Sequence, residues 1–269
     1  MPLAQNFGHE VWTVAGYDLC QAKRQEKVME RVLILGSGPA APDAARWDLS
    51  NFDAVVAINN AWRAVPDWTH HIHPDDFPPE RRPEVVKAGQ QVVTSAQYVP
   101  AQNAYGGFVY AGGTMAFTAA YWALHALRPR VMCFFGCDMV YPASSQTHFY
   151  GTGAADPLRD DPTLKSLPAK ARRLQYFAAA QDCAVINLSE AESVLPYPRH
   201  DVRVLFDAIA PLPFNATQVE AARDLETQAG YYVPSGMYWT ELTRFSQDTL
   251  DSIDAMWLRA FPKETMPCG

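Results

Sequence analysis

Short runs of apolar residues recur along this chain, separated by segments of mixed polarity. Six strands are predicted at residues 31–35, 52–58, 68–73, 91–94, 131–135 and 183–186; most are largely apolar, and the segment at 68–73 contains three histidines. Continuous runs of this length are typical of strands buried on both faces of a parallel sheet. Helical patterns lie between some of them, at residues 79–88, 115–127 and 163–180. The alternation predicts an α/β fold over residues 30–200, with a Rossmann-like, doubly wound and mostly parallel sheet.

An extension flanks this domain at each end. The N-terminal extension comprises residues 1–29, which are of mixed character. The C-terminal extension comprises residues 201–269 and is helical and aromatic-rich. One of its helices is expected at 217–229, because Asn215 suits an N-cap and Gly230 suits the position just after a helix.

The last expected helix, residues 246–261, has two different faces. Its apolar face contains Leu250, Ile253, Trp257 and Phe261. Its acidic face contains Asp248, Asp251 and Asp254. Because an amphipathic helix buries its apolar stripe, we expect the extension to pack on the α/β domain or on a second copy of the chain. The extension is therefore a candidate surface for a homo-oligomer.

The charge balance narrows the class of protein. With 22 Lys and Arg against 29 Asp and Glu, the 269-residue chain has a formal net charge of −7. A nucleic-acid-binding protein usually has a basic surplus or stripe, so we expect no nucleic-acid partner. No run reaches the roughly 18 apolar residues of a membrane span, and the first residues lack the pattern of a secretion signal. We therefore expect a cytoplasmic protein without integral membrane contact.

Glycine or polar residues follow several of the predicted strands. Gly36, Ser37, Gly38 and Pro39 follow the first strand, and Asn59 and Asn60 follow the second. In such sheets, ligands bind at the carboxyl ends of the strands. Backbone amides at a glycine turn suit a phosphate, and asparagine amides suit a ribose or a base edge. The alternatives are a glycine turn without a ligand and asparagines that only cap the next helix.

Two further stretches could contribute to the same pocket. Gly112, Gly113 and Thr114 precede the helix at 115–127 and would let a ligand approach the backbone, unless the glycines serve only close packing. His73 ends the third strand and could face the pocket. The nearby cluster of His70, His71, Asp75 and Asp76 also raises the possibility of a metal site. Zinc needs three or four well-placed ligands, so we expect none here.

The segment after the fifth strand has the residues best suited to catalysis. Asp138 at the strand end could fix a loop or a ribose, and Tyr141 and Tyr150 could donate to a departing phosphate. His148 lies between the two tyrosines in the sequence and could act as a general base near neutral pH. The alternative is a surface loop without a catalytic role.

Together these stretches resemble the small bacterial sialyltransferases (glycosyltransferase family 42) and the related 6-hydroxymethylpterin diphosphokinase (MptE)-like, motility-associated glycosyltransferase group. The resemblance covers about residues 31–198. It rests on the Gly-Ser-Gly-Pro turn at 36–39, on Asn59, on His73 followed by proline, on Gly-Cys-Asp at 136–138 and on His-Phe-Tyr-Gly at 148–151. These stand where that group has a Gly-Asn-Gly-Pro turn, an asparagine, Asn-Pro, Gly-x-Asp and His-Tyr-x-Gly-His.

The resemblance implies transfer of a sugar from a nucleotide, possibly the CMP-linked kind, without a metal or other cofactor. It assigns Tyr141 to the departing phosphate. Thr152 replaces the final histidine of that group, its general base, so His148 would have to take over this role. One alternative is an ATP- and Mg²⁺-dependent diphosphokinase acting on a pterin-like alcohol, with Asp75, Asp76 and Asp138 as carboxylates. The other, which Thr152 favours, is a non-catalytic module that binds a nucleotide or sugar.

Overall fold

The computed structural model describes residues 29–141, 146–151, 159–204, 206 and 209–261. Nearly all of the N-terminal extension therefore lies outside the described residues. Six parallel strands form one sheet in the order β4-β3-β2-β1-β5-β6, which confirms the predicted Rossmann-like α/β fold. The strands are β1 (Arg31–Leu35), β2 (Ala54–Ile58), β3 (His70–Ile72), β4 (Gln91–Val93), β5 (Val131–Phe135) and β6 (Ala184–Asn187).

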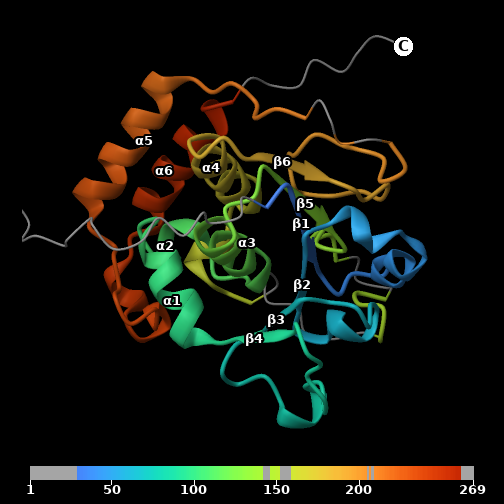
Figure 1. Cartoon of the computed structure of the whole chain (residues 1–269). Coiled ribbons are helices and arrows are strands. Elements are labelled where there is room, and N and C mark those ends of the chain that lie inside the picture. Colours follow the sequence, from blue (N-terminus) through green and yellow to red (C-terminus); the bar gives the residue numbers. More distant parts are fainter. Residues whose placement is uncertain (1–28, 142–145, 152–158, 205, 207–208, 262–269) are drawn as a thin grey trace, which may run out of the picture.

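The α-helices lie on one side of the sheet (Figure 1). They are α1 (Ser95–Asn103), α2 (Phe108–Ala111), α3 (Met115–Ala126), α4 (Leu167–Ala179), α5 (Ala216–Ala229) and α6 (Gln247–Arg259). In the described part of the chain, the 3-10 helices η1 (Ala41–Arg46), η2 (Leu49–Asn51) and η3 (Asn59–Arg63) cover the other face. Successive β1 residues alternate between the two cores, with Val32 and Ile34 on the α-helical side and Leu33 and Leu35 opposite.

Proline accounts for two differences from the predicted helices. The helix expected at 79–88 is only the 3-10 helix η4 (Pro79–Arg81), since Pro83 lacks an N–H donor and disfavours helical geometry in the residue before it. The helix expected at 163–180 is divided into η6 (Pro162–Leu164) and α4. Pro168 lies in the first turn of α4, where a proline costs no hydrogen bond.

The C-terminal extension packs on the α/β domain. Leu250, Ile253, Trp257 and Phe261 are buried in the core that also contains β1 and β5, as their spacing predicts. Asn215 and Gly230 cap α5 as expected. Asp254 of the acidic face is only 3% exposed. Its carboxylate is buried and pairs with Lys170 Nζ at 2.7 Å. A homo-oligomer remains a prediction.

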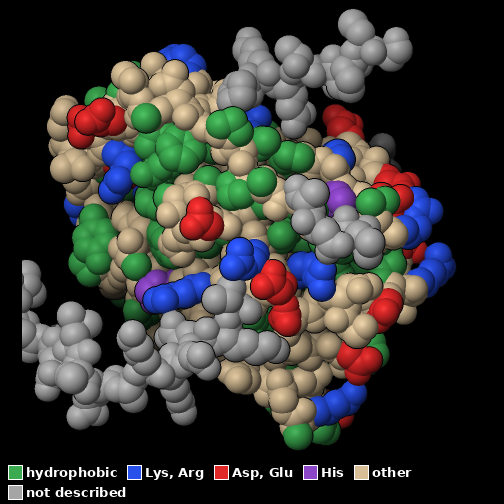
Figure 2. Space-filling view, turned by 45° about the horizontal axis from the view of Figure 1, so that its top comes forward, with side chains coloured by type: hydrophobic (Ala, Val, Ile, Leu, Met, Phe, Trp, Pro, Cys, Tyr) green, Lys and Arg blue, Asp and Glu red, His purple; other side chains and the backbone are tan. Residues whose placement is uncertain are grey.

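Charged side chains of both signs are distributed over the surface. Figure 2 shows basic and acidic groups interspersed on the face drawn, without a continuous basic stripe there. None of the helices in the described ranges has the length and apolar character needed to cross a bilayer.

Candidate functional site

A cavity of about 240 Å³ opens at the carboxyl ends of β1, β2 and β5. The chain runs outward from β1 to β4 on one side and then returns to place β5 on the other side of β1. Such a switch point is where open α/β sheets bind ligands. We call this the switch-point cavity. Of the predicted residues it brings together Gly36, Ser37, Gly38, Pro39, Asn59, Asn60, Thr114, Asp138, Tyr141, His148 and Tyr150. His73, Gly112 and Gly113 do not line it.

The first glycine turn packs directly on the turn after β5. Gly38 N donates to Gly136 O at 2.8 Å, and a Cβ on Gly36 would lie 2.3 Å from the same oxygen. Packing between the two strand ends therefore accounts for these glycines without a ligand. The helix that follows is η1, a short 3-10 helix, so it provides little of the positive helix end expected there for a phosphate.

The N-terminus of α3 supplies that positive end instead. Thr114 caps the helix, and its Oγ1 accepts from Phe117 N at 3.2 Å. Met115 and Ala116 lie in the first turn, where backbone N–H groups have no partner within the helix, and both residues line the cavity. Arg81 lines it as well. Free amides, the helix dipole and a guanidinium together favour an anion.

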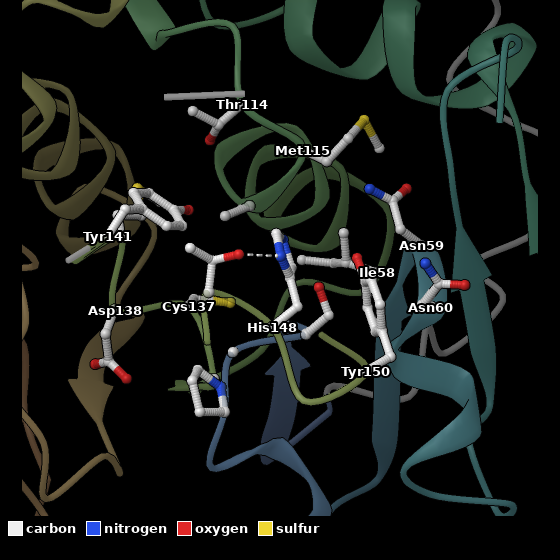
Figure 3. Close-up of a pocket in the computed structure, with 18 of the residues that line it drawn as sticks. Ile58, Asn59, Asn60, Thr114, Met115, Cys137, Asp138, Tyr141, His148 and Tyr150 are labelled. Carbon is white, nitrogen blue, oxygen red and sulfur yellow. Dashed lines mark hydrogen bonds between the residues drawn. The ribbon is translucent and has the colours of Figure 1, made fainter. Parts of the chain in front are cut away.

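Asn59 and Asn60 present two amide side chains across the cavity from Tyr141 (Figure 3). Neither amide caps η3, because the N-cap of that helix is Ile58 and it has no side-chain hydrogen bond. The Oδ1 atoms of both residues are buried without a hydrogen-bond partner. Capping of η3 therefore does not explain why asparagines occupy these two positions. Both residues line the cavity, so the parts of their amides that are not enclosed are available to a ligand.

His71 forms a hydrogen bond to the backbone of Asn59. Its Nε2 donates to Asn59 O at 2.8 Å, and Asn59 has a left-handed φ of 51°. The predicted strand-end histidine, His73, lies elsewhere: it is buried beside His71 and Phe77, and its Nδ1 donates to Pro74 O at 2.8 Å. No group of three metal-binding side chains occurs among the described residues. Alternation along β3 could have suggested His71, but not its contact with Asn59.

Burial of His71 makes the fold sensitive to acid. It lowers the pKa of His71 from 6.5 to about 4. The unfolded chain therefore takes up this proton first, and the free energy of unfolding falls as the pH falls from 6.5 to 4, by about 3 kcal/mol in total. Urea unfolding at several pH values between 6.5 and 4 measures how steeply the free energy of unfolding falls with pH. His71→Gln keeps a donor toward Asn59 O without titrating, so its slope should be shallower. Equal slopes in both proteins would contradict this.

Asp138 serves the fold of the neighbouring loop. Its Oδ2 accepts from Ser189 Oγ at 2.8 Å, and its Oδ1 lies 3.4 Å from Asn187 Nδ2. Figure 3 shows the carboxylate pointing away from His148. Of the two uses that the sequence left open, the structure shows the first, the fixing of a loop. A contact with a ribose stays a prediction.

His148 and Tyr141 extend into the same cavity (Figure 3). His148 Nδ1 lies 3.0 Å from the hydroxyl of Thr147, and its ring stacks on Tyr150 at 5.0 Å. When Nδ1 donates to Thr147, Nε2 has a lone pair and can accept a proton. Phe149 N donates to Ser37 O at 3.1 Å, which fixes this loop to the first glycine turn. Thr152 lies outside the described residues.

The second pair of predicted glycines serves packing between helices and the C-terminal extension. Gly112 has a φ of 87°, and a Cβ there would lie 3.0 Å from Lys170 Cγ. A Cβ on Gly113 would lie 1.8 Å from the hydroxyl oxygen of Tyr238. These contacts explain both glycines, and a sequence pattern cannot reveal a partner so distant along the chain.

The switch-point cavity thus combines donors for an anion with amides suited to a ribose or base. Comparison of the chain with protein-family models, with curated proteins and with solved structures finds no match. The function of this chain therefore has to follow from the switch-point cavity and from the residues that line it.

Proposed function

We propose that this chain is a glycosyltransferase that binds a nucleotide-activated sugar in the switch-point cavity. The observation that favours it most is the pair of amide residues, Asn59 and Asn60, that line this cavity at the end of β2. An asparagine side chain can donate to a ligand acceptor or accept from a ligand donor, and each such hydrogen bond contributes about 0.5–1.5 kcal/mol. A nucleotide has such donors on its ribose and base.

The phosphates are assigned to the start of α3 and to Arg81. The N–H groups of Met115 and Ala116 and the side chain of Arg81 are the donors available there. The ribose or base then lies toward Asn59 and Asn60. This placement sets the negative charge against the positive end of α3 and leaves the neutral amides for the neutral part of the ligand.

Transfer then requires a base and a group that assists the leaving phosphate. His148 Nε2 takes the proton of the acceptor hydroxyl, whose oxygen forms a bond to the anomeric carbon of the sugar. The bond between that carbon and the phosphate oxygen breaks, and its electron pair stays with the phosphate. The Tyr141 hydroxyl donates a hydrogen bond to this oxygen. Tyr150, stacked on His148, orients the imidazole. The CMP-linked donor is suggested by the resemblance of the sequence.

No observation favours the diphosphokinase alternative over this proposal. That reaction needs carboxylates gathered around Mg²⁺ and ATP phosphates. Asp75 and Asp76 line a different cavity from Asp138, and the Asp138 carboxylate is held by Ser189.

The Asn60→Ala variant tests the proposal through binding. We expect it to weaken binding of the matching nucleotide about tenfold, since one ligand hydrogen bond is lost. Its free energy of unfolding should stay level or rise, because the substitution removes a buried acceptor that has no partner. Calorimetric titration and urea unfolding measure the two quantities.

Gln102→Met is the matched control. Gln102 is also buried with both amide atoms unpartnered, but it does not line the cavity. This variant should leave nucleotide affinity unchanged. Unchanged affinity in Asn60→Ala would remove Asn60 from the site, and an equal loss in both variants would point to a general effect on the fold.

A further inference from the structure

A second cavity, of about 910 Å³, adjoins the first. The two share Thr114 and Met115 at the start of α3. The second lies between α1 and the C-terminal extension, and we call it the aromatic cavity. Its lining includes Tyr98, Phe108, Tyr238, Trp239, Met237 and Leu242.

Four aromatic rings form a continuous wall in this cavity. Tyr98 meets Phe108 edge-on at 6.4 Å, and Phe108 stacks on Tyr238 at 6.4 Å with 17° between the ring planes. Tyr238 in turn lies 5.6 Å from Trp239, whose side chain is 59% exposed. An exposed tryptophan at the end of a ring cluster offers an apolar and electron-rich surface to a ligand.

A buried polar network joins this wall to the start of α3. The Tyr238 hydroxyl donates to Asp161 at 2.7 Å and accepts from Arg159 at 2.6 Å. Asp161 also accepts from Thr163, and Gly113 N donates to Thr163 Oγ1 at 3.1 Å. The wall is therefore held in a defined position next to the switch-point cavity.

The charged side chains of the aromatic cavity are mostly negative. Among the described lining residues, the acidic side chains are Asp75, Asp76, Asp160 and Asp161, and the basic one is Arg159, which pairs with Asp161 at 2.9 Å. Burial raises the pKa of Tyr98 to about 12, and the charges of Asp75 and Asp76 add to the shift. The negative charges of Asp75 and Asp76 therefore lie close enough to Tyr98 to interact with it electrostatically.

We propose that the aromatic cavity binds an organic cation, namely an amine or quaternary ammonium group on an apolar body. Trp239, the exposed ring of the four, contacts the apolar body and the charged head, and Asp75 and Asp76 supply the opposite charge. The two adjacent cavities thus select opposite charges. Resting on the proposed function, we assign a cation of this class that also carries a hydroxyl as the acceptor substrate, because its cavity meets the switch-point cavity at Thr114 and Met115.

Calorimetric titration with benzyltrimethylammonium tests the inference in the absence of any nucleotide. We expect saturable binding of this cation, weaker binding of neutral benzyl alcohol and no binding of benzenesulfonate. Asp75→Asn/Asp76→Asn should weaken cation binding about fivefold or more, and Trp239→Ala about threefold. These residues are exposed, so the variants should fold normally.

The matched control is Asp43→Asn/Asp67→Asn, which removes two exposed carboxylates that do not line the cavity. It should bind the cation like the natural chain. Equal binding of benzenesulfonate, absence of cation binding at millimolar concentrations, or an equal effect of both double variants would overturn the inference. If the cation binds as expected but no nucleotide does, the cation site stands and the proposed transferase function fails.

Discussion

Replacing His148 with alanine is expected to slow sugar transfer about 10²–10⁴-fold, the usual contribution of a positioned general base. Nucleotide affinity should change by less than about twofold, because the imidazole acts on the acceptor hydroxyl and not on the nucleotide. The measurement is the rate of CMP release from a CMP-linked sugar, together with calorimetric titration of CMP.

Tyr150→Phe is the control for this variant. It keeps the ring that stacks on His148 at 5.0 Å and removes only the hydroxyl, so the transfer rate should fall far less than in His148→Ala, by no more than the loss of one hydrogen bond to the departing phosphate. Full activity in His148→Ala would remove His148 from the mechanism. Nucleotide binding without turnover in the natural chain would instead favour a non-catalytic binding module.

Glu226→Gln is expected to lower the free energy of unfolding by about 3–5 kcal/mol. Glu226 accepts from Arg173 at 2.7 and 2.8 Å and from Trp257 Nε1 at 2.8 Å, so it joins α4, α5 and α6. Arg173 is 1% exposed, and the neutral amide leaves its charge buried without a counter-ion. Urea unfolding near neutral pH measures the loss.

The exposed pair of Glu241 and Arg244 provides the matched control. Both side chains reach solvent, so Glu241→Gln should cost less than about 1 kcal/mol. A similar small cost for Glu226→Gln would show that the buried pair does not hold the C-terminal extension on α4.

Strands β1, β2, β5 and β6 could be predicted from the sequence because each is a short, largely apolar run with buried residues on both faces. Helix α1 was missed because its sequence contains Pro100 and lacks an apolar stripe. The available signal was the capping box of Thr94 and Gln97. The 3-10 helices on the second face leave no periodic pattern of their own, so the layer they form could not be anticipated.

The site residues that lie at the meeting strand ends could be predicted from the sequence. Those whose position depends on packing between distant parts of the chain could not. Asn59, Asn60 and His148 reach the switch-point cavity because the carboxyl ends of parallel strands share one edge. His73 follows a strand too, but its ring turns into the core beside Phe77. The partner that accounts for Gly113, Tyr238, comes from the C-terminal extension. Such long-range packing leaves no local pattern in the sequence.

The most direct test of nucleotide binding at the switch-point cavity is thermal unfolding with CMP, UDP, GDP, ADP and ATP, each with and without Mg²⁺. A ligand at ~100 times its Kd adds about 2.7 kcal/mol and should raise Tm by several degrees. We predict a metal-independent rise with CMP that is reduced in Asn60→Ala. A rise only with ATP and Mg²⁺ would favour diphosphoryl transfer, and no rise with any nucleotide would contradict the proposed function.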